Sequence, residues 1–260
     1  MKTEKKTRVS FSEGDVKVSL PRGWHELTEG ELAEVYRLAA KYDTATLPVM
    51  VFRHLTGMRV HREVDGKWLV SFPVTNRVRR RCLLSDSAIG SAVSSLGWLR
   101  QAGNIPVRLR SMRKGVAVDA QLHGVEFGVW LQVENYYQSY LNALSPEPLH
   151  GIATLLYPGF SGGELSIHEQ MNILNWVTQI KSLFAEQFRN LFSGDGTGGS
   201  SQSMLEIMNN EIRILSGGDV TKEDVVLSCD CWRALTELDY KAKEAQDLNR
   251  EIEKSRNGRK

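Results

Sequence analysis

The stretch Ser166–Phe192, SIHEQMNILNWVTQIKSLFAEQFRNLF, decides how this chain of 260 residues folds. Ser166 and Glu169 have the spacing of a capping box, which predicts that a helix begins there. Apolar residues then recur at helical spacing: Ile173, Trp176, Val177, Ile180, Phe184, Phe188, Leu191 and Phe192. A helix with so wide an apolar face is typical of a buried position, so we expect it to be the spine of the core.

Polar sequence follows the spine. The tract Gly194–Ser203, GDGTGGSSQS, consists mainly of Gly and Ser, a composition that buries too little apolar surface to order. We therefore predict a flexible linker at 194–203. Beyond it, Thr221 has the position of a helix cap within a charged segment, so we expect a helical arm over 204–260. Such an arm favours assembly or partner binding over catalysis.

The residues before the spine combine strand and helix signals. Alternating apolar residues on both sides of Ser12–Asp15 predict a hairpin over 7–20. Asp65 and Gly66 predict the turn of a second hairpin. Thr28, with Glu31 three residues later, forms another capping box. We also expect a helix over 85–102, a strand over 107–109 and mostly helix from 121 onward.

These patterns predict an α+β, mainly helical protein. It should have small N-terminal β-hairpins, a helical body, a flexible linker and a C-terminal helical arm. The expected regions are a basic α+β region at 1–118, a helical core region at 119–193, the linker at 194–203 and the arm at 204–260.

The charge is unevenly distributed. Residues 1–118 carry 21 Lys and Arg against 11 Asp and Glu, and residues 119–260 carry 12 against 20. Halves of opposite sign can dock on each other, face different partners or simply be solvated. Two basic clusters stand out: Arg77, Arg79, Arg80 and Arg81, and then Arg108, Arg110, Arg113 and Lys114. They could contact the phosphates of a nucleic acid weakly, bind a protein, or be paired within the fold.

The number of cysteines and the hydropathy of the sequence indicate in which cellular compartment the protein acts. The three cysteines, Cys82, Cys229 and Cys231, do not make a disulfide framework, which fits a reducing cytoplasm. The N-terminal residues lack the apolar segment of a secretory signal. The longest apolar runs, such as Leu47–Phe52, are far shorter than the ~18 residues that span a bilayer. We expect a cytoplasmic protein with no membrane association.

Three short motifs match catalytic, cofactor or metal sites, but none has the neighbouring residues or elements that such a site requires. Gly159–Gly163 matches the nucleophile elbow G-x-S-x-G, but a serine hydrolase then needs an acid and a distant histidine, and only His168 follows. The glycines of the linker match G-x-G-x-x-G without the preceding strand that a dinucleotide site requires. Cys229 and Cys231 have no further ligands at metal-binding spacing. We expect no catalytic residues, no metal and no cofactor; an enzyme with an unrecognised site remains an alternative.

The C-terminal arm contains a candidate partner-binding group. Trp232 is a large apolar ring in a heavily charged segment, and Leu235 and Leu238 share its helix. A buried Trp is a common interface anchor, so these three residues are predicted to lie in a groove of a partner. The alternative is that they pack on the body of their own chain, over 121–192.

Two stretches together suggest a family. One is Leu20–Thr28, LPRGWHELT, and the other extends over Met208–Leu238, beginning MNNEIRIL. They resemble an uncharacterised family encoded in the structural-gene clusters of prophages from gut anaerobes, near tail genes. The resemblance implies a role in virion morphogenesis, most specifically tail assembly, as an assembly factor or a component. It implies phage tail or other virion proteins as partners, acting in the host cytoplasm or in the virion. It supplies no catalytic residues. Nucleic-acid binding through the arginine clusters is the first rival function.

Overall fold

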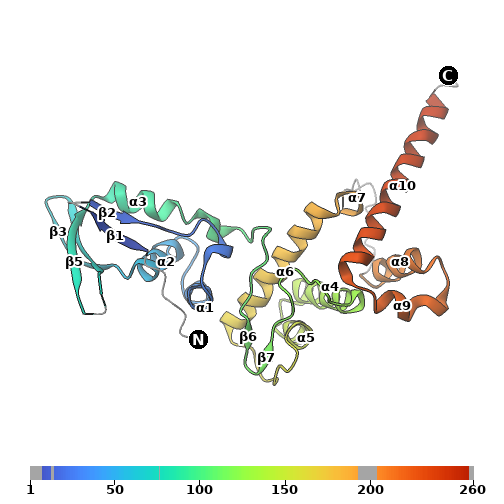
Figure 1. Cartoon of the computed structure of the whole chain (residues 1–260), viewed down its shortest axis with the longest axis horizontal. Coiled ribbons are helices and arrows are strands. Elements are labelled where there is room, and N and C mark those ends of the chain that lie inside the picture. Colours follow the sequence, from blue (N-terminus) through green and yellow to red (C-terminus); the bar gives the residue numbers. More distant parts are fainter. Residues whose placement is uncertain (1–7, 13–14, 76, 193–203, 258–260) are drawn as a thin grey trace. The chain divides into compact units, whose positions relative to one another are not determined.

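The computed structural model describes residues 8–12, 15–75, 77–192 and 204–257. Within them the fold is mainly helical with small antiparallel sheets, as the sequence predicts. The chain divides into two compact units (Figure 1). Unit 1 comprises residues 1–110 and 166–176, and unit 2 comprises residues 111–165 and 177–260. The predicted linker at 194–203 lies outside the described residues.

Unit 1 contains two of the small sheets. Strands β1 (Val9–Ser12) and β2 (Asp15–Val18) form the first predicted hairpin. Strands β3 (Arg59–Val64) and β4 (Lys67–Pro73) form the second, and Asp65 and Gly66 at its turn both have positive φ. Strand β5 (Arg79–Leu84) pairs with β4 and completes a three-stranded sheet. The sequence predicted both hairpins but missed β5.

Two helices of unit 1, the first and the second, supply much of its core. Helices α1 (Glu29–Ala39) and α2 (Leu47–Thr56) are followed by α3 (Asp86–Ser94), and short 3-10 turns lie at Trp24–Glu26 and Gly97–Arg100. The buried residues include Val35, Tyr36, Val51, Phe52 and Phe72. The capping box between Thr28 and Glu31 is confirmed.

Glu31 also joins a buried ion pair. Arg8 Nε and Nη2 donate to its two carboxylate oxygens at 3.2 and 3.0 Å, and the two side chains are only 2% and 9% exposed. Burial alone would raise the pKa of Glu31, but hydrogen bonds from Arg8 and Thr28 and the charge of Arg8 together lower it. The carboxylate thus fastens the N-terminal hairpin to the start of α1.

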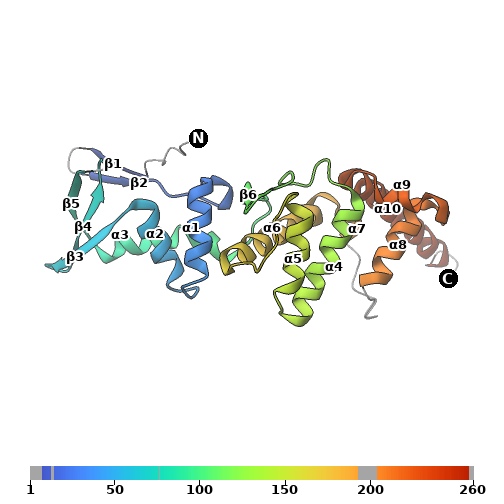
Figure 2. The same ribbon diagram turned by 90° about the horizontal axis from the view of Figure 1, so that it is seen from below.

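Unit 2 is built on paired helices. Helix α4 (Phe127–Ala143) packs beside α5 (Glu147–Leu156), and Figure 2 shows the two running alongside each other. The two-residue strands β6 (Ser111–Met112) and β7 (Gly115–Val116) precede them. Helix α6 (Ile167–Gln187) is the predicted spine; its first ten residues belong to unit 1 and the others to unit 2. The backbone N–H of Ser166 donates to the Glu169 carboxylate at 2.8 Å, which is one of the two hydrogen bonds of the predicted capping box. Ser166 Oγ donates to the same carboxylate oxygen.

The rest of unit 2 comes from the C-terminal sequence. Helix α7 (Arg189–Phe192) is followed by α8 (Met204–Ser216), a 3-10 turn at Val220–Lys222, α9 (Glu223–Leu227) and α10 (Cys231–Asn257). Helix α10 packs against α4, α7 and α8. None of the described helices combines the length and the hydropathy that a membrane-spanning helix requires.

Three elements differ from the sequence prediction. Residues 107–109 form no strand, and the helix expected over 85–102 ends at Ser94 before a 3-10 turn. The last helix does not begin at Thr221. Asp230 forms an isolated β-bridge with Glu126, so residues 228–230 leave the helical path before α10 begins. This bridge joins segments far apart in the chain, which local periodicity does not report.

A cluster of charged groups lies between α4, α6 and α8. Both carboxylate oxygens of Glu134 accept from Lys181 Nζ, at 2.5 and 2.8 Å. Burial raises the pKa of Glu211, on α8, to about 7, and the charge of Glu134 adds to the shift. A carboxyl whose pKa is higher in the folded protein stabilises the fold below its unfolded pKa, and this contribution is lost as the pH rises to the folded value.

We therefore expect the protein to be more resistant to urea at pH 5 than at pH 8. Glu211→Gln keeps the shape without the charge, so it should raise the urea midpoint at pH 8 and reduce the difference between the two pH values. Circular dichroism during urea titration measures this. Glu206→Gln, at an exposed position of the same helix, is the control. Equal pH dependence in Glu211→Gln and the wild type would contradict the assignment.

Candidate anion-binding pocket

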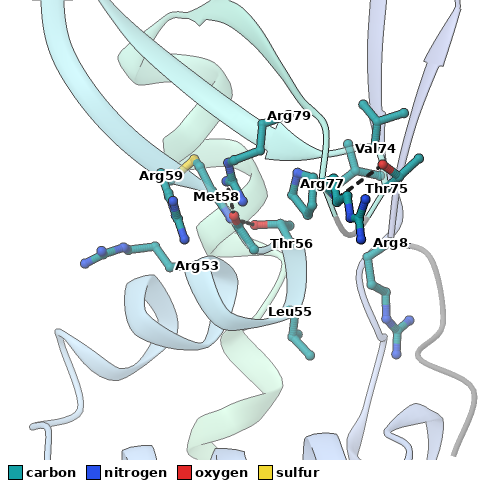
Figure 3. A pocket seen from close by; sticks show the side chains of 13 residues that line it. Arg8, Arg53, Leu55, Thr56, Met58, Arg59, Val74, Thr75, Arg77 and Arg79 are labelled. Atoms are coloured by element: carbon teal, nitrogen blue, oxygen red, sulfur yellow. Dashed lines mark hydrogen bonds between the residues drawn. The ribbon is translucent and has the colours of Figure 1, made fainter.

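A pocket of about 800 Å³ opens in unit 1. It lies where the end of α2, the start of β3 and the β4–β5 connection meet (Figure 3). Its lining is Arg8, Val9, Arg53, Leu55, Thr56, Gly57, Met58, Arg59, Pro73, Val74, Thr75, Arg77 and Arg79. Gly57 ends α2 with a positive φ of 64°, which turns the chain directly into β3 and brings both elements to the same rim.

All cations of this pocket are arginines. The described lining residues include five arginines and no lysine, aspartate or glutamate. Arg53, Arg59 and Arg77 are exposed, and no carboxylate in the described part of the chain forms an ion pair with them. A guanidinium presents its donors as a planar fork that fits a phosphate or carboxylate with two hydrogen bonds. The pocket is therefore suited to an anion.

Arg79 holds the frame of the pocket together. Its Nη2 donates to the carbonyl oxygens of Gly57 and Ser71 at 2.5 and 2.6 Å, and its Nε donates to Ser71 Oγ at 3.1 Å. Partial burial lowers the pKa of Arg79, and the charge of Arg59 lowers it further. Arg79 thus links α2 to the sheet, and its proximity to Arg59 concentrates positive charge that an anion would relieve.

Arg8 makes a smaller contribution to the charge of the pocket. It is buried, and its guanidinium is paired with Glu31 and also donates to the Glu26 carbonyl at 3.2 Å. The exposed cations that can reach a ligand are therefore Arg53, Arg59 and Arg77.

The first predicted basic cluster is divided by strand geometry. Arg77 and Arg79 line the pocket. Alternate residues of a strand point to opposite faces of a sheet, so Arg80 faces away from Arg79 and Arg81. Arg80 is paired across the sheet with buried Phe72, and its guanidinium lies 5.0 Å from the ring of Phe11. Arg80 and Arg81 are exposed outside the pocket lining.

The second predicted cluster does not form one open basic surface. Arg108 and Arg110 belong to unit 1, where Arg108 lies 5.6 Å from the Trp176 ring and Arg110 contacts Glu29. Arg113 belongs to unit 2, where it donates to two carbonyl oxygens of the 158–166 loop. Lys114 is exposed.

Sequence reasoning missed Arg53 and Arg59. Each is isolated among apolar or polar residues and forms no run of charge. The local sequence indicates only that both flank the same turn: Arg53 lies in the last turn of α2, and Arg59 is the first residue of β3, two positions after Gly57. Only the pairing of β4 with β5 brings Arg77 and Arg79 to them.

The elbow-like serine lies in a loop. Ser161 is part of the 158–166 connection, in which Gly159, Gly162 and Gly163 have positive φ. The Nδ1 atom of His168 pairs with Ser166 Oγ at 3.1 Å. Among the described residues, no three His, Cys, Asp or Glu side chains are grouped as a metal site would require.

The three predicted partner-binding residues contact their own unit. Leu235 and Leu238 are 1% and 2% exposed. Trp232 stacks on His123 with ring centroids 4.6 Å apart, and its Nε1 donates to the Gln121 carbonyl at 2.6 Å. Phe184 and Phe188 meet its ring edge-on. The structure thus has the alternative arrangement, with α10 packed on the body of its own chain.

The chain was compared with protein-family models, curated proteins and solved structures, and none of the three comparisons found a relative. No protein-family model matches the chain, and no curated protein or solved structure is found to be similar to it.

We expect Trp232→Ala to lower the free energy of unfolding by about 3 kcal/mol, because it removes an aromatic side chain that packs against three other rings. Thermal and urea unfolding of the full chain measure the loss. Tyr240→Ala, at a 63% exposed position of the same helix, should leave stability nearly unchanged. If Trp232→Ala unfolds like the wild type, the side chain does not anchor α10 in solution.

Proposed function

We propose that this protein is a non-enzymatic assembly factor or structural component of a phage particle, and that unit 1 binds a nucleic acid. The phage role is what the resemblance of Leu20–Thr28 and Met208–Leu238 implies. The observation that carries nucleic-acid binding is the pocket of five arginines without a carboxylate among its described lining residues. Exposed arginines in a concave surface are typical of phosphate contacts.

The net charges of the two units support the assignment of nucleic-acid binding to unit 1. Unit 1 contains 19 Lys and Arg against 12 Asp and Glu, a net charge of +7, whereas unit 2 contains 14 against 19, a net charge of −5. A positive field attracts polyanions and speeds their association. Unit 1 is therefore the part suited to a nucleic acid, and unit 2 is suited to a different class of partner.

Tail assembly is the second candidate role, and a surface of unit 2 favours it. A groove of about 440 Å³ runs between the end of α8, α9 and α10. Val225 and Tyr240 line it and are 68% and 63% exposed. Exposed apolar side chains gathered in one place mark protein-binding surfaces. In this proposal virion tail proteins occupy the groove, in the host cytoplasm or in the particle.

We expect the full chain to bind DNA weakly, with a Kd of roughly 10⁻⁶ to 10⁻⁴ M near physiological salt and no sequence preference. Affinity should fall steeply as salt increases, because each neutralised phosphate releases counterions. Fluorescence anisotropy with labelled duplexes of unrelated sequence measures both. Absence of binding at low salt would refute nucleic-acid binding.

The tail-assembly role is tested in cells that produce the phage. The tagged protein should co-purify with tail proteins, and Val225→Asp should abolish this, because it places a charge among the apolar side chains of the groove. Val116→Asp, at a 65% exposed position of β7, is the matched control. Co-purification that survives Val225→Asp would exclude this groove, and its absence in the wild type would count against the tail role.

A further inference from the structure

The arginine pocket suggests a more specific ligand than a general basic surface would. We propose that it is a dedicated phosphate-binding site that takes two or more successive phosphates of a nucleic-acid strand, through Arg53, Arg59 and Arg77. This inference rests on the proposed nucleic-acid binding and names its site. Two of these three arginines belong to neither basic run of the sequence.

The arrangement of the rim indicates successive phosphates. In Figure 3, Arg53 and Arg59 lie on one side of the opening and Arg77 lies on the other, with Thr56 between them. They come from α2, β3 and the β4–β5 connection. A volume of about 800 Å³ exceeds what one phosphate group needs and is within the range of ligand-binding pockets. The pocket therefore has room for more than one phosphate group, so that consecutive phosphates of one strand can contact the arginines on both sides.

The chemistry of the lining favours phosphates over bases. The described lining has no aromatic ring on which a base could stack, and its apolar side chains, such as Met58 and Val74, are aliphatic. Phosphate contacts fix a nucleic acid in place but do not read its sequence. The cations are guanidinium forks throughout, and these fit phosphate oxygens in a bidentate manner. The site should therefore recognise the backbone of any nucleic acid.

Hydrogen bonds within the chain hold the frame that supports these arginines. Arg79 ties the end of α2 to β4 through Gly57 and Ser71, and the Nε2 atom of His61 pairs with Ser71 Oγ at 2.8 Å. These bonds join the end of α2 to β4 and β3 to β4, the elements that carry Arg53 and Arg59. A pre-formed support for these two side chains lowers the entropic cost of binding.

The test uses the full chain and a labelled DNA duplex over a range of salt. The double variant Arg53→Gln/Arg59→Gln, and separately Arg77→Gln, should weaken binding. The slope of log K against log salt should become shallower by about 0.9 for each phosphate contact that is lost. Arg100→Gln, which removes an exposed arginine of unit 1 outside the pocket, should change neither quantity. All substituted positions are exposed, so the melting temperatures should match the wild type.

Competitors define the ligand. Inorganic tripolyphosphate should displace the duplex from the wild type better than inorganic phosphate does, and better than citrate or polyglutamate at equal charge. This advantage should disappear in Arg53→Gln/Arg59→Gln. If polyglutamate competes as well as tripolyphosphate, the site takes carboxylates and the proposal is wrong. If phosphate and tripolyphosphate compete equally, the pocket holds one phosphate only.

The outcomes separate this inference from the function on which it rests. If the wild type binds DNA and the pocket variants bind with unchanged affinity and slope, the site is elsewhere on unit 1 and only the inference fails. If the wild type does not bind DNA at low salt, the proposed nucleic-acid binding and the inference fail together.

Discussion

The buried ion pair between Glu31 and Arg8 is the interaction on which the rest of unit 1 depends. The Glu31 carboxylate accepts from Thr28 at the start of α1 and, at the same time, from the buried guanidinium of Arg8. One group therefore fixes where α1 begins and where the N-terminal hairpin rests. Removing either partner would leave a buried charge unpaired, which typically costs 3–5 kcal/mol. Because Arg8 also lines the pocket, its pairing with Glu31 locates one wall of that cavity.

The five arginines of the pocket fall into two groups, one that stabilises the walls and one that is exposed. Arg8 and Arg79 are committed to carboxylate and carbonyl oxygens, and they hold the walls. Arg53, Arg59 and Arg77 project from those walls without such partners among the described residues. Substituting Arg79 would therefore disturb the fold as well as the charge, and a loss of binding in such a variant would not identify a ligand contact. Substituting an exposed arginine would change the charge of the pocket and leave the hydrogen bonds of Arg8 and Arg79 in place.

The sequence was enough to predict the elements that depend on residues close together in the chain. The capping box at Thr28, the bond from the Ser166 backbone to Glu169 and the Asp65-Gly66 turn appear where their spacing predicts, because each depends on residues three or fewer positions apart. Strand β5 was missed because its run of arginines hides the alternation that Cys82 and Leu84 supply on the buried face. The pocket was missed for a related reason: Arg53 and Arg59 meet Arg77 only through sheet pairing.

The division of α6 between the two units has a consequence for how the protein is made. Asn172 on this helix accepts from the backbone of Leu109 at 2.9 Å, and Asn175 donates to the Tyr36 hydroxyl at 3.0 Å, so unit 1 is completed by residues that follow a long stretch of unit 2. On the ribosome, residues 1–110 emerge without these partners and must wait for 166–176. Domains generally fold as units during synthesis, and unit 1 cannot finish until both helices of the pair in unit 2, α4 and α5, have been translated. The last segment to join unit 1 is thus the first half of α6, and the second half of the same helix belongs to unit 2.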